Sequence, residues 1–184
     1  MNFPSLGWRA TRGACTACST PLFLMKTIVI GLGNPILGDD GVGWKVAEEV
    51  QKQITSPPTP LLAGEGSEVD VEFLSLGGIS LMEHLIGYER AILIDALNSN
   101  QETGSVIVSK LNEMPDYSAF HITSVHDTSL RTALQLGKAM GASLPGEITV
   151  VGIATQHVYD FGEELSPPVA EAIPKAAQIV IRLL

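Results

Sequence analysis

The segment Ile28–Val46, IVIGLGNPILGDDGVGWKV, constrains the fold most, because an apolar strand runs into glycines and then into a helical pattern. Glycines after a buried strand are typical of a tight turn at the edge of an α/β sheet. Two adjacent acids, Asp39 and Asp40, follow them. A dinucleotide fingerprint would need a third glycine where this chain has Ile36, and two carboxylates would repel a phosphate. The segment therefore argues against a nucleotide site.

From Thr27 onward, short β-branched runs alternate with longer amphipathic stretches, which is typical of a layered α/β fold. Several runs are almost continuously apolar, which predicts central strands covered by helices on both faces. We expect a three-layer α/β/α sandwich around a five-stranded, mostly parallel twisted sheet. The expected strands are Thr27–Leu32, Val69–Leu76, Ala91–Ala96, Ser105–Lys110 and Ile148–Ile153. The expected helices are Val42–Gln53, Ile79–Tyr88, Asp127–Met140 and Pro167–Leu183, with a kink at Pro174 and a loop at Ile54–Ser67.

Length and composition fit a single compact domain, because 184 residues with 45% hydrophobic content can bury a sizeable core. We expect that domain to span residues 25–184. Residues 1–24 are expected to be a disordered or loosely attached extension, although two arginines and no acids also fit an organellar transit peptide. Cys15 and Cys18 lie in this extension without a partner at zinc-site spacing, so the domain suits a reducing compartment.

Net charge and hydropathy exclude two classes of partner. The formal net charge of −9 disfavours a nucleic-acid surface. No apolar run reaches the length that crosses a membrane. We expect a monomer.

The two adjacent acids are expected to divide their roles. An aspartate before the helix that begins near Val42 can accept hydrogen bonds from unpaired amides of its first turn. We assign that cap to Asp39 and direct Asp40 toward a cation at the carboxyl edge of the first strand. Exchanging the two roles would leave the predicted function unchanged.

Two further side chains are expected at the same edge. Asp95 follows four apolar residues of AILIDA and is expected at the mouth of the sheet, although an acid there can also be a simple turn former. His126 precedes an amphipathic helix that Asp127 or Thr128 could cap, and a lone histidine near a cap is usually a surface residue. Together Asp40, Asp95 and His126 form a three-ligand set for a metal ion.

Two hydrolytic mechanisms stay open for such a set. A bound ion polarises a carbonyl and lowers the pKa of bound water. Alternatively, two neighbouring carboxylates share a proton and act as base and acid on a peptide bond.

The motif GLGNPILGDDGVG, with a later strand-terminal Asp95 and His126 in SVHD, resembles the nickel-iron hydrogenase maturation endopeptidases from about Lys26 to Leu184. The resemblance implies a cytoplasmic, aspartyl-type endopeptidase that removes the C-terminal extension of the hydrogenase large-subunit precursor after nickel insertion. It implies that Asp40, Asp95 and His126 are catalytic and contact nickel carried by the precursor, while a role for another divalent cation stays open. Many members carry Glu at the position of Asp40, and the shorter Asp moves the ligating oxygen inward.

Other positions match the family less closely. Gly77 and Gly78 resemble a glycine loop near the substrate cleft, but a plain helix-initiating turn explains them equally well. The segment GIATQHVYDFGEELSP departs from the Glu-Pro sequence that the family would suggest, which leaves a role for His157 open. His84 is interpreted as a packing or surface residue, and His121 as a loop residue.

Two functions compete with the endopeptidase. A metal-binding chaperone would hold nickel or the precursor tail without cutting it. GLGNP also opens peptidyl-tRNA hydrolases, but these continue with a Tyr and a Thr-Arg-His-Asn run, where this chain has Gly38-Asp39-Asp40.

Overall fold

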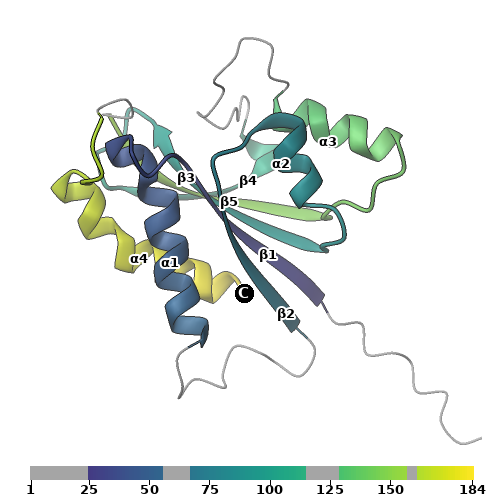
Figure 1. Cartoon of the computed structure of the whole chain (residues 1–184), viewed down its shortest axis with the longest axis horizontal. Coiled ribbons are helices and arrows are strands. Elements are labelled where there is room, and N and C mark those ends of the chain that lie inside the picture. The colour runs from purple at the N-terminus through teal and green to yellow at the C-terminus, as the bar shows by residue number, and fades with distance from the viewer. Residues whose placement is uncertain (1–24, 56–66, 115–128, 157–160) are drawn as a thin grey trace, which may run out of the picture.

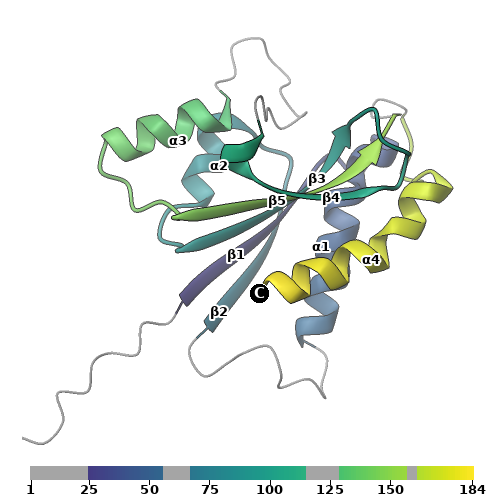
Figure 2. The same ribbon diagram turned by 180° about the vertical axis from the view of Figure 1, so that it is seen from behind.

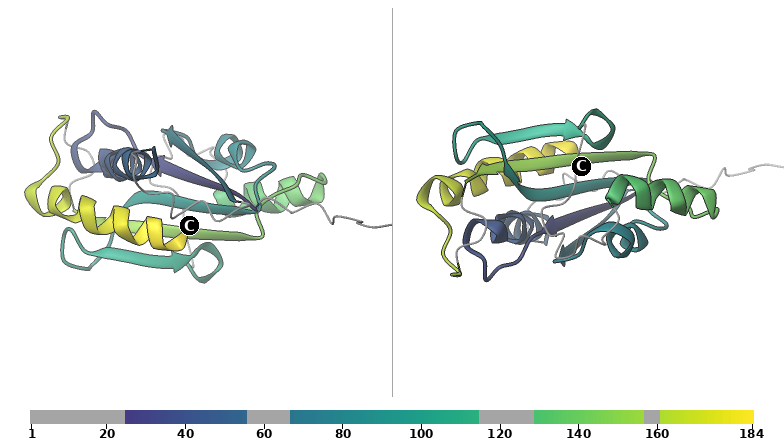
Figure 3. Two further views of the ribbon diagram at one scale, coloured as in Figure 1. Left: turned by 90° about the horizontal axis from the view of Figure 1, so that it is seen from below. Right: turned by 90° about the horizontal axis from the view of Figure 1, so that it is seen from above.

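A computed structural model describes residues 25–55, 67–114, 129–156 and 161–184, which form an α/β fold around one five-stranded sheet (Figure 1). The strand order is β2-β1-β3-β5-β4, with β4 antiparallel to β5 and the other pairings parallel. Figure 3 shows β4 at the outer edge of the sheet, beside β5. The strands are β1 (Met25–Leu32), β2 (Ser67–Leu74), β3 (Arg90–Asn98), β4 (Val106–Lys110) and β5 (Glu147–Thr155).

Helices cover both faces of the sheet, as the continuously apolar strands predicted (Figures 1 and 2). One face packs against α1 (Val42–Thr55) and α4 (Pro167–Leu183), which also contact each other. The other face packs against α2 (Gly78–His84) and α3 (Leu130–Ala139). Two short 3-10 helices, η1 (Gly38–Gly41) and η2 (Leu111–Glu113), complete the described elements. The expected three-layer sandwich is confirmed.

Several predicted element ends are wrong, and local hydrogen bonds explain two of them. Strand β2 ends at Leu74 instead of Leu76, and the hydroxyl of Ser75 donates to the carbonyl of Gly33 at 2.6 Å. Helix α3 begins at Leu130, because Ser129 is its N-cap and accepts a hydrogen bond from the amide of Thr132 at 3.3 Å.

The second helix also differs from its expected range. Helix α2 ends at His84, before Gly87, whose φ of 91° is in the left-handed region. Pro174 lies inside α4 as expected, and that helix has the predicted bounds. None of the described helices combines the length and the hydropathy that a membrane-spanning segment needs.

The last residues of the chain are anchored to the beginning of β3. The guanidinium of Arg90 donates to the carbonyl of Leu183 at 2.6 Å and to that of Leu184 at 3.4 Å. Arg90 is the first residue of β3, so these bonds fix the end of α4 beside the start of a central strand. They also satisfy carbonyls that the last turn of a helix leaves unpaired.

Helix α1 approaches the sheet closely because two glycines face each other. A Cβ on Gly43 would lie 2.1 Å from the carbonyl oxygen of Leu32 and 2.5 Å from that of Ile94. A Cβ on Gly31 would lie 2.5 Å from the carbonyl oxygen of Gly43. Backbone therefore packs directly on backbone, and any side chain at either position would push the helix off the sheet.

Gly43→Ala is expected to destabilise the protein by about 1–3 kcal/mol, because overpacking against backbone atoms cannot be relieved by a rotamer change. Helix propensity alone would favour alanine. Urea unfolding followed by circular dichroism measures the difference. Gly146→Ala is the matched control, because a Cβ there has no atom within 4 Å. Equal unfolding midpoints for the two variants would contradict the close-contact interpretation.

Candidate functional site

The loop that follows β1, residues 33–41, carries both adjacent acids and is called the acid loop here. It folds back on itself, because Gly33 has a φ of 131° and a Cβ at that residue would lie 1.9 Å from the carbonyl oxygen of Asp40. The amide of Gly33 donates to the carbonyl of Leu74 at 3.1 Å, so the loop starts beside the end of β2. Its 3-10 helix, η1, contacts β3.

The side chain of Asp40 is hydrogen-bonded to the start of the acid loop. Its Oδ2 accepts a hydrogen bond from the amide of Asn34 at 2.7 Å, and the residue is only 3% exposed. A buried carboxylate in this position holds the two ends of the loop together. The position agrees with the expectation that Asp40 lies at the carboxyl edge of the first strand.

Asp39 contacts a different part of the molecule from the one predicted. Its Oδ1 accepts from the amide of Ser166 at 2.6 Å, and its Oδ2 accepts from the hydroxyl of Ser166 at 2.8 Å and of Thr155 at 3.3 Å. Ser166 is the N-cap of α4, and Thr155 is the last residue of β5. The prediction that Asp39 caps α1 is wrong: the side chain binds the start of α4.

The segment before α4, residues 161–166, is hydrogen-bonded to the acid loop. The amide of Gly38 donates to the carbonyl of Gly162 at 2.7 Å, and the amide of Gly162 donates to the carbonyl of Ile36 at 3.1 Å. These bonds make a parallel bridge between Leu37 and Gly162. Residues 161–166 and the acid loop therefore form one hydrogen-bonded unit.

Asp95 was expected at the mouth of the sheet, but it lies inside β3 and is buried. The strand continues to Asn98, Asp95 is paired in register with Gly152 of β5, and its exposed fraction is 0%. Side chains alternate along a strand, and Leu93 and Leu97 belong to the core beneath α2 and α3. Asp95 therefore points to the α2–α3 face, within the buried layer.

His126 lies outside the described residues, and so do Asp127, Thr128, His121 and His157, together with Cys15 and Cys18. Among the residues that the structure does describe, no three His, Cys, Asp or Glu side chains form a group that could hold a metal ion. The three-ligand set of Asp40, Asp95 and His126 therefore stays a prediction.

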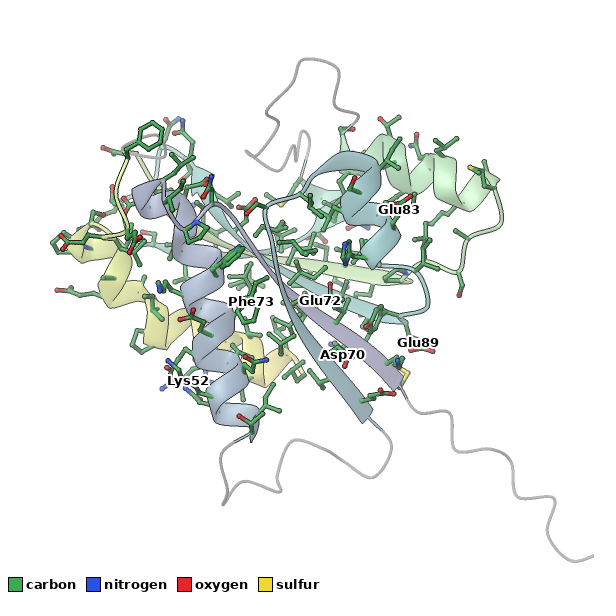
Figure 4. The ribbon with its side chains drawn as sticks, in the orientation of Figure 1. Lys52, Asp70, Glu72, Phe73, Glu83 and Glu89 are labelled. Carbon is green, nitrogen blue, oxygen red and sulfur yellow. The ribbon has the colours of Figure 1, made fainter. Side chains whose placement is uncertain are left out.

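The remaining described candidates lie at the two ends of α2. His84 ends α2, and its Nδ1 lies 2.8 Å from the Oε2 of Glu72, which Figure 4 labels on β2. The His84 side chain is 37% exposed, which agrees with a surface residue. Gly77 is the N-cap of α2, and Gly78 begins the helix with a φ of 53°, as the helix-initiating turn requires.

The contact of Asp39 with Ser166 and Thr155 was missed from the sequence. Ser166 stands before Pro167 and Pro168, and a serine before proline at the first helical position is a recognised helix start. That pattern predicts the cap, but it does not reveal which distant carboxylate the cap residue will contact.

Ser166→Ala is expected to lower the free energy of unfolding by about 1–3 kcal/mol, because a buried carboxylate loses one hydrogen-bond donor. Urea unfolding measures the change. Ser143→Ala is the control, because that serine is exposed. A loss of stability no larger than that of the control would show that the hydroxyl of Ser166 contributes nothing to the buried carboxylate.

Comparison with known proteins identifies the family. The family model described as HycI, hydrogenase maturation protease, matches residues 61–183. That range begins after the acid loop, so the match is independent of Asp39 and Asp40.

Curated relatives agree with the family model. The hydrogenase expression/formation protein HupD of Rhizobium leguminosarum bv. viciae is 25% identical over 159 residues, which cover 86% of this chain and 74% of that protein. HupM of Azotobacter chroococcum is 26% identical over 157 residues, 85% of this chain and 70% of the relative.

Solved structures share the fold. The hydrogenase maturating endopeptidase HybD from E. coli superposes with a TM-score of 0.61 at 21% identity, covering 87% of this chain and 92% of that one. The hydrogenase 2 maturation peptidase from a Thaumarchaeota archaeon gives a TM-score of 0.57 at 26% identity, covering 86% and 97%. This chain therefore belongs to the hydrogenase maturation protease family and is a protease.

Proposed function

We propose that this endopeptidase removes the C-terminal extension of a nickel-iron hydrogenase large-subunit precursor after nickel has been inserted. One observation carries the proposal: a member of this family has two buried carboxylates, Asp40 in η1 and Asp95 in β3, and η1 contacts β3. Burying a carboxylate costs free energy, so two buried carboxylates on contacting elements favour a functional role.

Of the adjacent acids, we propose Asp40, in the loop that follows β1, as the one that contacts a cation. Both oxygens of Asp39 already accept hydrogen bonds from the start of α4 and the end of β5. These bonds support a structural role for Asp39 and a cation-contact role for Asp40, although Asp39 binds the start of α4 and not that of α1.

His126 is proposed as the third ligand. Asp95 points to the face covered by α2 and α3, and His126 precedes α3 by a few residues in the chain. We propose that the three side chains contact nickel carried by the precursor, so the metal serves as part of the substrate. The enzyme is proposed to act in the cytoplasm as a monomer.

Peptide hydrolysis needs a group that takes a proton from water and a group that returns one to the leaving amine. A carboxylate near the scissile carbonyl can accept the proton as water attacks the carbonyl carbon. The same carboxylic acid can then donate it to the nitrogen as the C–N bond breaks. Asp40 and Asp95 are the described candidates for this exchange.

Asp40→Asn and Asp95→Asn are each expected to lower the cleavage rate of nickel-loaded precursor by at least about 100-fold, because the amide cannot act as a base. Asparagine keeps an acceptor for the amide of Asn34, so the acid loop is expected to stay folded. Gel electrophoresis of the precursor measures cleavage, and circular dichroism checks the fold.

Asp70→Asn is the matched control for loss of a carboxylate. Asp70 lies on β2, where Figure 4 labels it, and accepts a hydrogen bond from the hydroxyl of Tyr88 at 2.7 Å. Burial, together with this bond and the Asp70 charge, raises the pKa of Tyr88 to about 12. An asparagine still accepts that bond, so cleavage is expected to proceed at the normal rate. Full activity of both site variants would contradict the proposal.

Removing metal from the enzyme before the reaction distinguishes the carboxylate mechanism from a mechanism that uses a resident catalytic metal. Enzyme treated with a chelator and then desalted is expected to cleave nickel-loaded precursor at the untreated rate, because the metal arrives with the substrate. Precursor without nickel is expected to stay uncut. Lost activity that zinc or another divalent ion restores would instead indicate a resident catalytic metal.

Binding without cutting would indicate the chaperone function instead. If precursor and protein form a stable complex but the precursor keeps its full length after long incubation, the cleavage proposal fails.

A further inference from the structure

We propose that a cleft between α3 and the start of β5, apart from the acid loop, binds an organic anion that carries carboxylate or phosphate groups. The cleft, called the α3 cleft here, has a volume of about 550 Å³. Its lining combines the charged side chains of Lys110, Arg131, Lys138 and Glu147 with apolar ones such as Leu111 and Pro145. This volume lies within the range of small-molecule sites.

The charge of the lining is opposite to that of the chain. Three lining residues are cationic, Lys110, Arg131 and Lys138, and one is acidic, Glu147, while the whole chain has a formal net charge of −9. The Nζ of Lys110 lies 3.3 Å from the Oε1 of Glu147, so that pair is largely neutralised. Glu113 is close by, and its Oε2 accepts from the amide of Lys110 at 3.4 Å. Arg131 and Lys138 supply the remaining positive charge.

Two backbone carbonyls hold the side chain of Arg131 in place, and they use only some of its N–H donors. Its Nη2 donates to the carbonyl of Leu111 at 2.9 Å and to that of Met114. A guanidinium carries five N–H donors, so three stay without a hydrogen bond to any described residue. Arg131 is half-buried, and no described acid forms an ion pair with it. A fixed, partly desolvated guanidinium with no carboxylate partner among the described residues is suited to an oxyanion.

The cleft also has an apolar part, which favours an organic anion over an inorganic one. Leu111 and Pro145 are buried, while Leu134 and Ile148 are half-buried. An inorganic phosphate would leave most of this volume filled with water. A ligand with an apolar body can cover these side chains while its anionic group reaches Arg131.

The α3 cleft is separate from the acid loop. Glu147 begins β5, whereas the acid loop contacts the opposite end of that strand through Thr155. A strand of nine residues spans roughly 26–30 Å. Figure 2 shows α3 well away from α1 and α4.

The test is a titration of the isotopically labelled full chain, followed by amide chemical shifts. The probes are inorganic phosphate, ATP, citrate and a tetraglutamate peptide, which separate phosphoryl from carboxyl sources. At least one organic probe is expected to shift amides of residues 131–138 and 146–148 with a Kd of about 1 mM or tighter. Inorganic phosphate is expected to bind more weakly, and added salt is expected to weaken all binding.

Lys138→Gln is the informative variant, because Lys138 is exposed and forms no ion pair with a described residue. The affinity for the organic probe is expected to fall about threefold. Lys175→Gln makes the same charge change on exposed α4 and is expected to leave the affinity unchanged. Arg131→Lys keeps the charge but loses the planar fork, and is expected to weaken binding about tenfold.

Three results would overturn the proposal. The first is the absence of saturable shifts with every probe. The second is an equal loss of affinity in Lys138→Gln and Lys175→Gln, which would indicate a general charge effect. The third is binding of inorganic phosphate as tight as that of the organic anions, which would remove the role of the apolar lining.

Discussion

The direct contact of helix α1 with the backbone of β1 and β3 is the constraint on which the rest of the structure depends. Gly31 and Gly43 permit it, because a Cβ at either position would lie within 2.5 Å of a backbone oxygen. A helix that starts so close to the sheet forces the preceding residues into a compact turn. That turn, η1, lies against β3 and carries both adjacent acids. The glycines of this motif therefore place carboxylates where a nucleotide-binding protein would place free amides.

A buried carboxylate is unfavourable unless hydrogen bonds replace its hydration. Asp39 obtains three such bonds, from Ser166 and Thr155, which belong to the last helix and the last strand. The desolvation of Asp39 is thus offset by groups from the far end of the chain. Asp40, its neighbour, is positioned by the same turn. The geometry of the site therefore depends on contacts with the end of β5 and the start of α4, which form only when these distant parts of the chain have folded together.

The layered fold was predictable from the sequence, because the apolar runs of β1, β3 and β5 can be satisfied only between two layers of helices. Element ends were less predictable where a single hydrogen bond decides them, as with Ser75 after β2 and Ser129 before α3. The role of Asp39 was not predictable, since its partner Ser166 is 127 residues away and no local pattern joins them. The burial of Asp95 inside β3 was missed because an acid in an apolar run resembles a strand end.

Helix α4 is fastened at both ends, by Asp39 at Ser166 and by Arg90 at Leu183 and Leu184. Its 17 residues form a rod roughly 26 Å long. Through these bonds, α4 joins the acid loop to the start of β3 across the face of the sheet that it shares with α1.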